Sequence, residues 1–212
     1  KARDFHNTRN KVAPANESAV AKKARIDKCN RDWQHLKVER RKIAAHFKLQ
    51  TQLTQYRESC KQRSAFELLA EKHHPTKTLA KNLAAVGEIK PTSFHEAHHI
   101  IPGKGRYMQA DMELCRLNLH GFGYGINDPI NGLWLRNFEP NRQDDWATPK
   151  SPTHRPLHNE NYEDWISDQF INDNLPEEIF INRLRTVKLK LKTGEHPTYI
   201  TQKGTSKTGS TA

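Results

Sequence analysis

The chain has 212 residues, enough for one large domain or two small ones. Its mean hydropathy of −0.93 and the lack of a long apolar run exclude a membrane span. The net charge of +11 is uneven, because residues 1–90 carry 21 Lys and Arg against nine Asp and Glu, and residues 91–212 carry 14 against 15. The basic N-terminal part favours a polyanionic partner such as nucleic acid, with a solvated helix surface as the alternative.

Residues 1–75 are expected to form a basic helical region. The first 15 residues are polar and predict a loose arm, whereas no Gly or Pro occurs from Ala15 to His74. Apolar residues recur there at spacings typical of one helical stripe, which predicts a long helix or a helical hairpin with a break near residues 49–54. His73 and His74 precede a proline, and we interpret them as a helix cap and a boundary.

The remaining chain alternates short helices with two short strands. Helices are expected over residues 79–86, 108–119, 159–170 and 176–192, and strands over Ile100-Ile101 and residues 133–135. Residues 201–212 are rich in Thr, Ser, Gly and Lys and predict a disordered tail. Three cysteines without a Cys-x-x-Cys pair indicate reduced thiols. We therefore expect an α+β fold that is mostly helical.

The doubled histidine His98-His99 is the centre of the chemistry that we expect. Adjacent residues of a strand point to opposite faces of a sheet. The two imidazoles should therefore have different roles, and their arrangement predicts that one binds a metal while the other faces a substrate.

His154 and His158 stand four residues apart, so a helical turn would place both imidazoles on one side. Together with His98 they would supply three nitrogen ligands and leave an open position, which is the pattern of a catalytic metal site. Nitrogen ligands favour a transition metal such as zinc over magnesium. His99 would then act as general base, with Asn131 as the candidate that fixes its tautomer by a hydrogen bond.

These motifs resemble the AHH group of the HNH, or endonuclease VII, superfamily of ββα-metal nucleases. The resemblance rests on the segments that follow, which span about residues 79–192: Leu79-Ala80-Lys81-Asn82-Leu83, Ala97-His98-His99-Ile100-Ile101-Pro102, Gly125-Ile126-Asn127-Asp128, Asn131-Gly132-Leu133-Trp134-Leu135, and His154-x3-His158 with Tyr162. By position, His98, His154 and His158 match the metal ligands, His99 the general base and Asn131 the asparagine that orients it.

The resemblance implies a metal-dependent endonuclease with a ββα-metal core that hydrolyses phosphodiester bonds, usually of DNA. It implies one divalent ion, with zinc as the expected occupant and Mg, Mn or Ni as alternatives for activity. Domains of this kind are often C-terminal toxin modules of secreted bacterial effectors, which act in the target-cell cytoplasm and are neutralised by an immunity protein. The chain starts at Lys1 without a visible signal peptide, so we expect a piece of a longer protein.

The expected domains are a basic helical region at 1–75, the nuclease domain at 76–195 and a flexible tail at 196–212. Because residues 91–212 are not basic, we expect the N-terminal helices to supply much of the electrostatic attraction for DNA. Two alternatives stay open. One is an RNase of the same fold, and the other is a non-catalytic nucleic-acid-binding module with a structural metal, which would need a fourth ligand such as His95 or His120.

Overall fold

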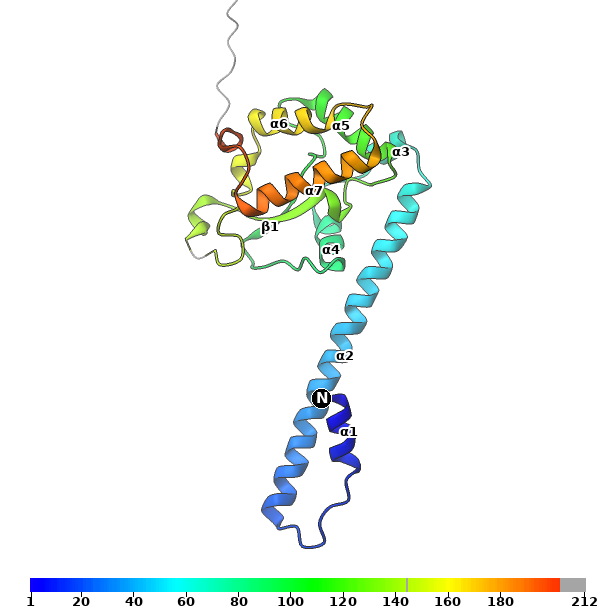
Figure 1. Ribbon diagram of the computed structural model, residues 1–212, viewed down its shortest axis with the longest axis vertical. Helices are drawn as coiled ribbons and strands as arrows, with labels where there is room; N and C mark the ends of the chain where they lie inside the picture. Colours follow the sequence, from blue (N-terminus) through cyan, green and yellow to red (C-terminus); the bar gives the residue numbers. More distant parts are fainter. Residues whose placement is uncertain (144, 203–212) are drawn as a thin grey trace, which may run out of the picture. The chain divides into compact units, whose positions relative to one another are not determined.

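The computed structural model describes residues 1–143 and 145–202 (Figure 1). The chain divides into two compact units, one of residues 1–48 and one that starts at Leu49. Most of the tail expected at 196–212 lies outside the described residues, and Thr198–Thr201 within it form a 3-10 turn, η4. In the described part of the chain, no helix is both long and apolar enough to span a membrane.

The first unit consists of helix α1 (Ala2–Asn10) and the first part of helix α2 (Ala19–Lys61). The expectation of a loose arm over residues 1–15 was wrong, because Phe5 of α1 stacks on Trp33 with ring centroids 5.7 Å apart. The expected break near residues 49–54 is also absent. Helix α2 continues to Lys61, as a run of good helix formers without Gly or Pro allows.

The second unit is built around a two-stranded antiparallel sheet. Strand β1 (His95–His99) pairs with β2 (Gly132–Arg136) so that His98 lies opposite Leu133 and His99 opposite Gly132. The expected strand at Ile100-Ile101 therefore begins five residues earlier and ends at His99. This shift places both histidines inside the paired segment.

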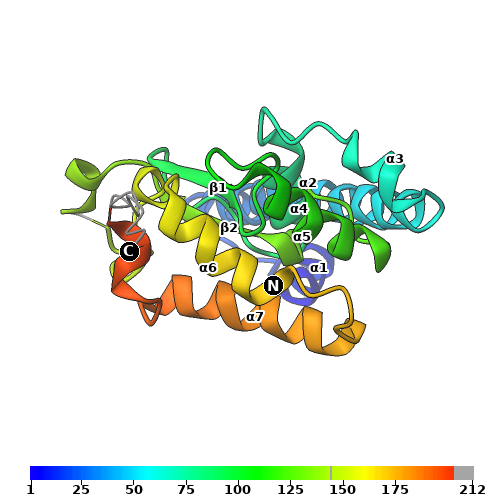
Figure 2. The ribbon, with the colours of Figure 1, turned by 90° about the horizontal axis from the view of Figure 1, so that it is seen from above.

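Helices cover both faces of this sheet (Figures 1 and 2). Leu133 and Leu135 of β2 join a core that is completed by α5 (Gln109–Gly121), α6 (Glu160–Phe170) and α7 (Glu177–Thr193). On the other face, Ala97 and Trp134 pack against α4 (Lys77–Ala85). Because side chains alternate along a strand, neighbouring residues of β2 face either the core with α5, α6 and α7 or the packing against α4.

Close packing requires glycine where α4 meets the sheet. A Cβ on Gly132 would overlap the side chain of Leu79, so a glycine opposite His99 lets α4 approach.

Helix α3 (Ala65–Leu69) carries a capping box formed by Ser64 and Glu67.

The remaining elements are short and frame the site. They are the 3-10 turns η1 (Pro129–Asn131), η2 (Glu139–Arg142) and η3 (Arg155–Leu157). Asn159 caps α6 by accepting a hydrogen bond from the backbone N–H of Tyr162. The predicted α+β, mostly helical fold is confirmed.

Candidate active site

His98 and His99 point to opposite sides of strand β1, as the alternation of a strand demands. His98 meets His154, His158 and Tyr162, whose ring centroids lie 5.0–5.9 Å from its own. His99 is directed toward Asn127 instead. The predicted separation of roles therefore has a geometric basis.

The three histidines expected to bind a metal come together. One nitrogen from each of His98, His154 and His158 lies within 4.8 Å of the others, and Nε2 of His154 is 2.9 Å from Nε2 of His158. The two later histidines flank η3, at its N-cap and C-cap positions, so a 3-10 turn rather than an α-helical turn brings them to one side. That they bind a metal stays a prediction.

Tyr162 selects the nitrogen that His98 offers. The hydroxyl of Tyr162 donates its proton to the carbonyl oxygen of Ile100 at 2.8 Å and lies 3.0 Å from Nε2 of His98. Since the hydroxyl has one proton, it accepts from His98, which must carry its proton on Nε2. Nδ1 of His98 is then the free ligand atom.

Glu96 does the same for His154. Its carboxylate accepts a hydrogen bond from Nδ1 of His154 at 2.6 Å, so Nε2 is left without a proton and faces His158. A carboxylate behind a histidine is a common arrangement at metal sites, where it fixes the ring and makes the ligand more basic. The spacing of the histidines gives no reason to single out Glu96, because its contact with His154 joins distant segments.

The electrostatics of the cluster suit a cation. Burial lowers the pKa of His154 to about 4 and lowers that of His158 below its ordinary value of 6.5. Burial also holds the pKa of His98 well below 6.5. All three rings are therefore neutral at pH 7, the form that binds a metal. The donor set fits a divalent transition metal.

The histidines named as a fourth ligand for a structural site lie elsewhere. His95 is hydrogen-bonded through both ring nitrogens, to Thr92 at 2.9 Å and Thr148 at 3.0 Å. His120 bonds the carbonyl oxygen of Tyr124 at 2.7 Å. Among the described residues only the three-histidine group meets the geometry for a metal, so neither histidine supplies the fourth ligand that the alternative of a structural metal would need.

His99 is oriented by Asn127, and the expectation that Asn131 does so was wrong. Nε2 of His99 lies 3.0 Å from Oδ1 of Asn127, which can only accept, so this nitrogen carries the proton and Nδ1 is free. Asn131 instead bonds the backbone N–H of Ile101 at 2.8 Å and its carbonyl oxygen at 3.2 Å. Asn127 belongs to Gly125-Ile126-Asn127-Asp128, one of the segments that carry the family resemblance. The spacing of residues along the sequence does not link it to His99.

Two adjoining pockets open onto these side chains. The inner one, of about 150 Å³, is lined by His98 and His99, and the outer one, of about 730 Å³, by His154 and His158. Burial lowers the pKa of His99 to about 4. This histidine is therefore neutral at pH 7, while it still lines a pocket that water can enter.

The pocket walls are basic although residues 91–212 as a whole are not. Their acidic residues are already engaged: Glu96 bonds His154, and Glu163 accepts hydrogen bonds from the backbone N–H groups of Tyr107 and Met108. The basic residues that line the two pockets are Lys77, Lys90, Lys104, Arg106 and Arg155. The second compact unit thus has its own group of basic side chains around the histidines.

His73 and His74 lie between the C-cap of α3, Ala70, and the N-cap of α4, Thr76, so interpreting them as a helix cap was wrong. Both line the inner pocket instead. The ring of His73 lies 6.4 Å from that of His99 and rests on Gly103, where a Cβ would overlap it. No signal in the sequence connected this doublet with the one at 98–99, because the residues between them form α4 and a loop.

In a comparison with protein families, residues 79–195 match the AHH family, described as a nuclease family of the HNH/ENDO VII superfamily with conserved AHH. The chain belongs to the AHH nuclease family. The match covers more than half of the chain and includes both strands, η3 and α6. No curated protein and no solved structure matches this chain. The chain is therefore a nuclease, as predicted.

Proposed function

We propose that the chain is a metal-dependent endonuclease that hydrolyses phosphodiester bonds of DNA. The observation that carries this proposal is the position of His99. His99 follows His98 directly in the sequence and lines the same pocket as the three-histidine cluster. Its own hydrogen bond goes to Asn127 and not to the cluster. A free imidazole nitrogen beside a group of ligands is the pairing that a hydrolytic site needs.

The side chains then have separate tasks. His98, His154 and His158 would hold one divalent ion, with zinc as the expected occupant and Mg, Mn or Ni as alternatives for activity. When bound, the ion would stabilise negative charge on the phosphodiester and on its leaving oxygen. Nδ1 of His99 would accept the proton of the attacking water, because Nε2 is already protonated and bonded to Asn127. Positioned bases of this kind contribute roughly 10²–10⁴ in rate.

The basic pocket walls support a polyanionic substrate. Lys77, Lys90, Arg106 and Arg155 line the outer pocket together with His154 and His158, and they would contact phosphates near the scissile bond. Arg155 also stacks on Phe138, with its guanidinium carbon 5.1 Å from the ring centroid, so a base or sugar could pack beside it. We choose DNA as the substrate, and RNA is an outcome that the test distinguishes.

We further propose that this nuclease is a toxin module of a secreted bacterial effector, which acts in the target-cell cytoplasm and is blocked by an immunity protein. The support is the AHH resemblance, since such domains often occur in this setting. Expression of the wild-type chain in bacteria should stop growth and degrade DNA, and expression of the His99→Ala variant should not. Equal growth of both cultures would reject the toxin role.

The test of the enzymatic proposal is cleavage of supercoiled plasmid by the purified chain. We expect nicked and linear DNA with Zn, Mg, Mn or Ni, no cleavage with chelator, and no cleavage by His99→Ala. His46→Ala is the matched control, because His46 is exposed on α2 in the other compact unit. Inert wild-type protein with every ion would reject the endonuclease, and degradation of RNA but not of plasmid would assign the activity to RNA.

A further inference from the structure

Asn127 is held by residues that precede the matched family domain. Its side-chain nitrogen donates to Oε1 of Glu71 at 2.7 Å and to the carbonyl oxygen of Lys72 at 3.1 Å. Its backbone N–H donates to the hydroxyl of Tyr56 at 3.1 Å. These three partners lie upstream of residue 79, where the family match begins.

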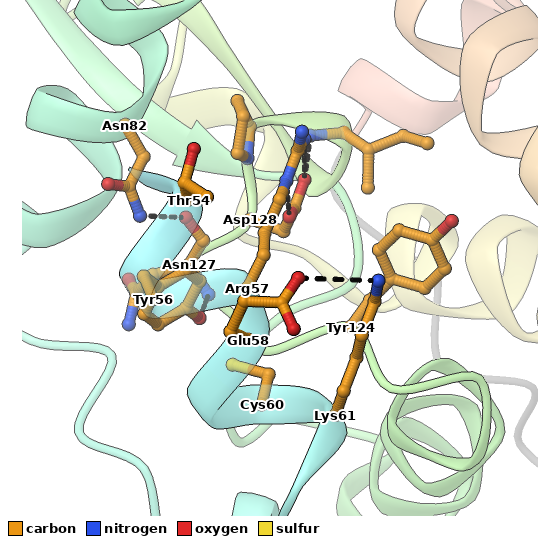
Figure 3. Close-up of polar contacts among 12 residues, drawn as sticks. Thr54, Tyr56, Arg57, Glu58, Cys60, Lys61, Asn82, Tyr124, Asn127 and Asp128 are labelled. Atoms are coloured by element: carbon orange, nitrogen blue, oxygen red, sulfur yellow. Dashed lines mark hydrogen bonds and ion pairs between the residues drawn. The ribbon is translucent and has the colours of Figure 1, made fainter. Parts of the chain in front are cut away.

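Helix α4 completes the enclosure of Asn127. The side chain of Asn82 donates to the backbone carbonyl oxygen of Asn127 at 2.9 Å, as Figure 3 shows. Asn127 itself is 1% exposed, and each of its polar groups has a partner. A buried amide that is bonded on all sides is fixed in a single orientation.

Glu71 and the carbonyl oxygen of Lys72 together decide which end of the Asn127 amide meets His99. A carboxylate and a carbonyl oxygen only accept hydrogen bonds, so the nitrogen of the amide must face Glu71 and Lys72. The amide oxygen is then left for His99, and the imidazole must donate from Nε2. The identity of the free nitrogen on His99 therefore depends on an acceptor more than 20 residues upstream.

The end of α2 keeps Glu71 and the Asn127 loop in place. Tyr56 donates its hydroxyl proton to Glu71 at 2.9 Å, and burial together with that carboxylate raises the pKa of this tyrosine, so it stays a donor. Arg57 forms two hydrogen bonds of 2.7 and 3.0 Å with Asp128, visible in Figure 3. A Cβ on Gly125 would overlap the Tyr56 hydroxyl, so this loop is shaped to receive the helix.

We infer that Glu71 and Tyr56 are positioning residues of the nuclease: through Asn127 they hold His99 in the tautomer whose Nδ1 is free to accept a proton. The inference rests on the proposed role of His99. It also assigns residues 49–72 to the working site, although the family match starts at residue 79.

Glu71→Met and Glu71→Gln are the test, both in the full chain. Methionine has a similar length and removes the acceptor, whereas glutamine retains an amide oxygen that can accept from Asn127. Glu58→Met is the matched control, because Glu58 is exposed on α2 and its ion pair of 3.6 Å with Lys61 joins two exposed side chains. Thermal unfolding of all three variants reports whether they fold.

Two measurements are expected to agree. In plasmid cleavage, Glu71→Met should lower kcat by about tenfold to a hundredfold with KM little changed, and Glu71→Gln should recover much of this loss. In side-chain ¹⁵N NMR spectra at pH 8, His99 should show a protonated Nε2 in the wild type and a mixture of tautomers in Glu71→Met. Glu58→Met should match the wild type in both.

An unchanged His99 tautomer in a folded Glu71→Met protein would overturn the inference, and so would a loss of activity that appears only in KM. The NMR measurement needs neither cleavage nor metal. If the wild type cleaves nothing with any ion, the proposed function fails, while the tautomer of His99 in Glu71→Met still decides whether Glu71 acts through Asn127.

Discussion

The carboxylate of Glu96 lies 2.6 Å from Nδ1 of His154, across 58 residues of sequence. Strand β1 therefore carries a ligand candidate, His98, and also the residue that orients a second one. Because the hydrogen bond to Glu96 leaves only Nε2 of His154 available, the geometry of the cluster depends on a side chain that is not itself among the three histidines.

Glu96→Gln is expected to weaken binding of Zn²⁺ by about tenfold to a hundredfold, because an amide is a poorer acceptor than a carboxylate. Competition with a chromophoric chelator measures this change. Glu113→Gln, an exposed position on α5, serves as the control and should bind like the wild type. Equal affinity in Glu96→Gln would show that the carboxylate does not tune the site.

Lys77→Gln should weaken DNA binding by about 1 kcal/mol, or about fivefold in Kd, and reduce the slope of log K against log salt by about 0.9. Lys77 lines the outer pocket, whereas Lys81 is exposed on the same helix and does not line it. Lys81→Gln is therefore the paired control. Fluorescence anisotropy at several salt concentrations, with catalysis blocked by chelator, compares the two, and an equal effect of both would argue against a specific contact.

The basic N-terminal helix offers a separate test of electrostatic attraction. Arg40→Gln combined with Arg41→Gln removes two exposed charges from α2 within the first compact unit. If this helix contacts DNA, binding should weaken and the salt slope should fall by up to about 2, while kcat stays the same. Unchanged affinity would leave the pocket walls as the main source of attraction.

The stability of the metal-free chain should fall as the pH drops. Burial lowers the pKa of His120 from 6.5 to about 4. The unfolded state then binds a proton more readily than the folded state, so this contribution is complete above pH 6.5 and is lost as the pH falls toward 4. For His120 alone the loss between pH 7.5 and 4.5 is about 2.5 kcal/mol.

Urea unfolding of the wild type and His120→Gln at pH 7.5 and 4.5 measures the contribution of His120 to the free energy of unfolding. Other buried histidines contribute in the same direction, and comparison of the two proteins cancels them. Arg63 and Arg116 also disfavour a positive charge on His120. Because glutamine does not titrate, the free energy of unfolding of the variant should fall less between pH 7.5 and 4.5. The same loss of stability in both proteins would show that His120 is not responsible.

Much of the second unit was predictable from local patterns. Hydrophobic periodicity located α5, α6 and α7, and strand alternation separated His98 from His99. These features depend on residues close together in sequence, where side-chain chemistry and backbone geometry are directly coupled.

The rest depends on contacts between distant segments. No spacing rule could connect Glu71 with Asn127, or place His73 on Gly103, because the connecting chain forms independent elements. The α1 helix was missed because its stabilising contact, Phe5 on Trp33, is also non-local. The domain boundary expected at residue 75 stays a prediction, although the compact unit starts at Leu49 and the family match at residue 79.

Asn131 acquires a different importance from the one first expected. With His98 and His99 adjacent, a slip of β1 by a single residue against β2 would exchange the two rings between the faces of the sheet. The side chain of Asn131 forms hydrogen bonds with both backbone groups of Ile101, two residues beyond the strand. The backbone carbonyl oxygen of Asn131 accepts a hydrogen bond from the N–H of Ile100 at 2.9 Å. The register of β1 against β2 therefore keeps His99, the proposed proton acceptor, and His98, the proposed metal ligand, on their own faces of the sheet.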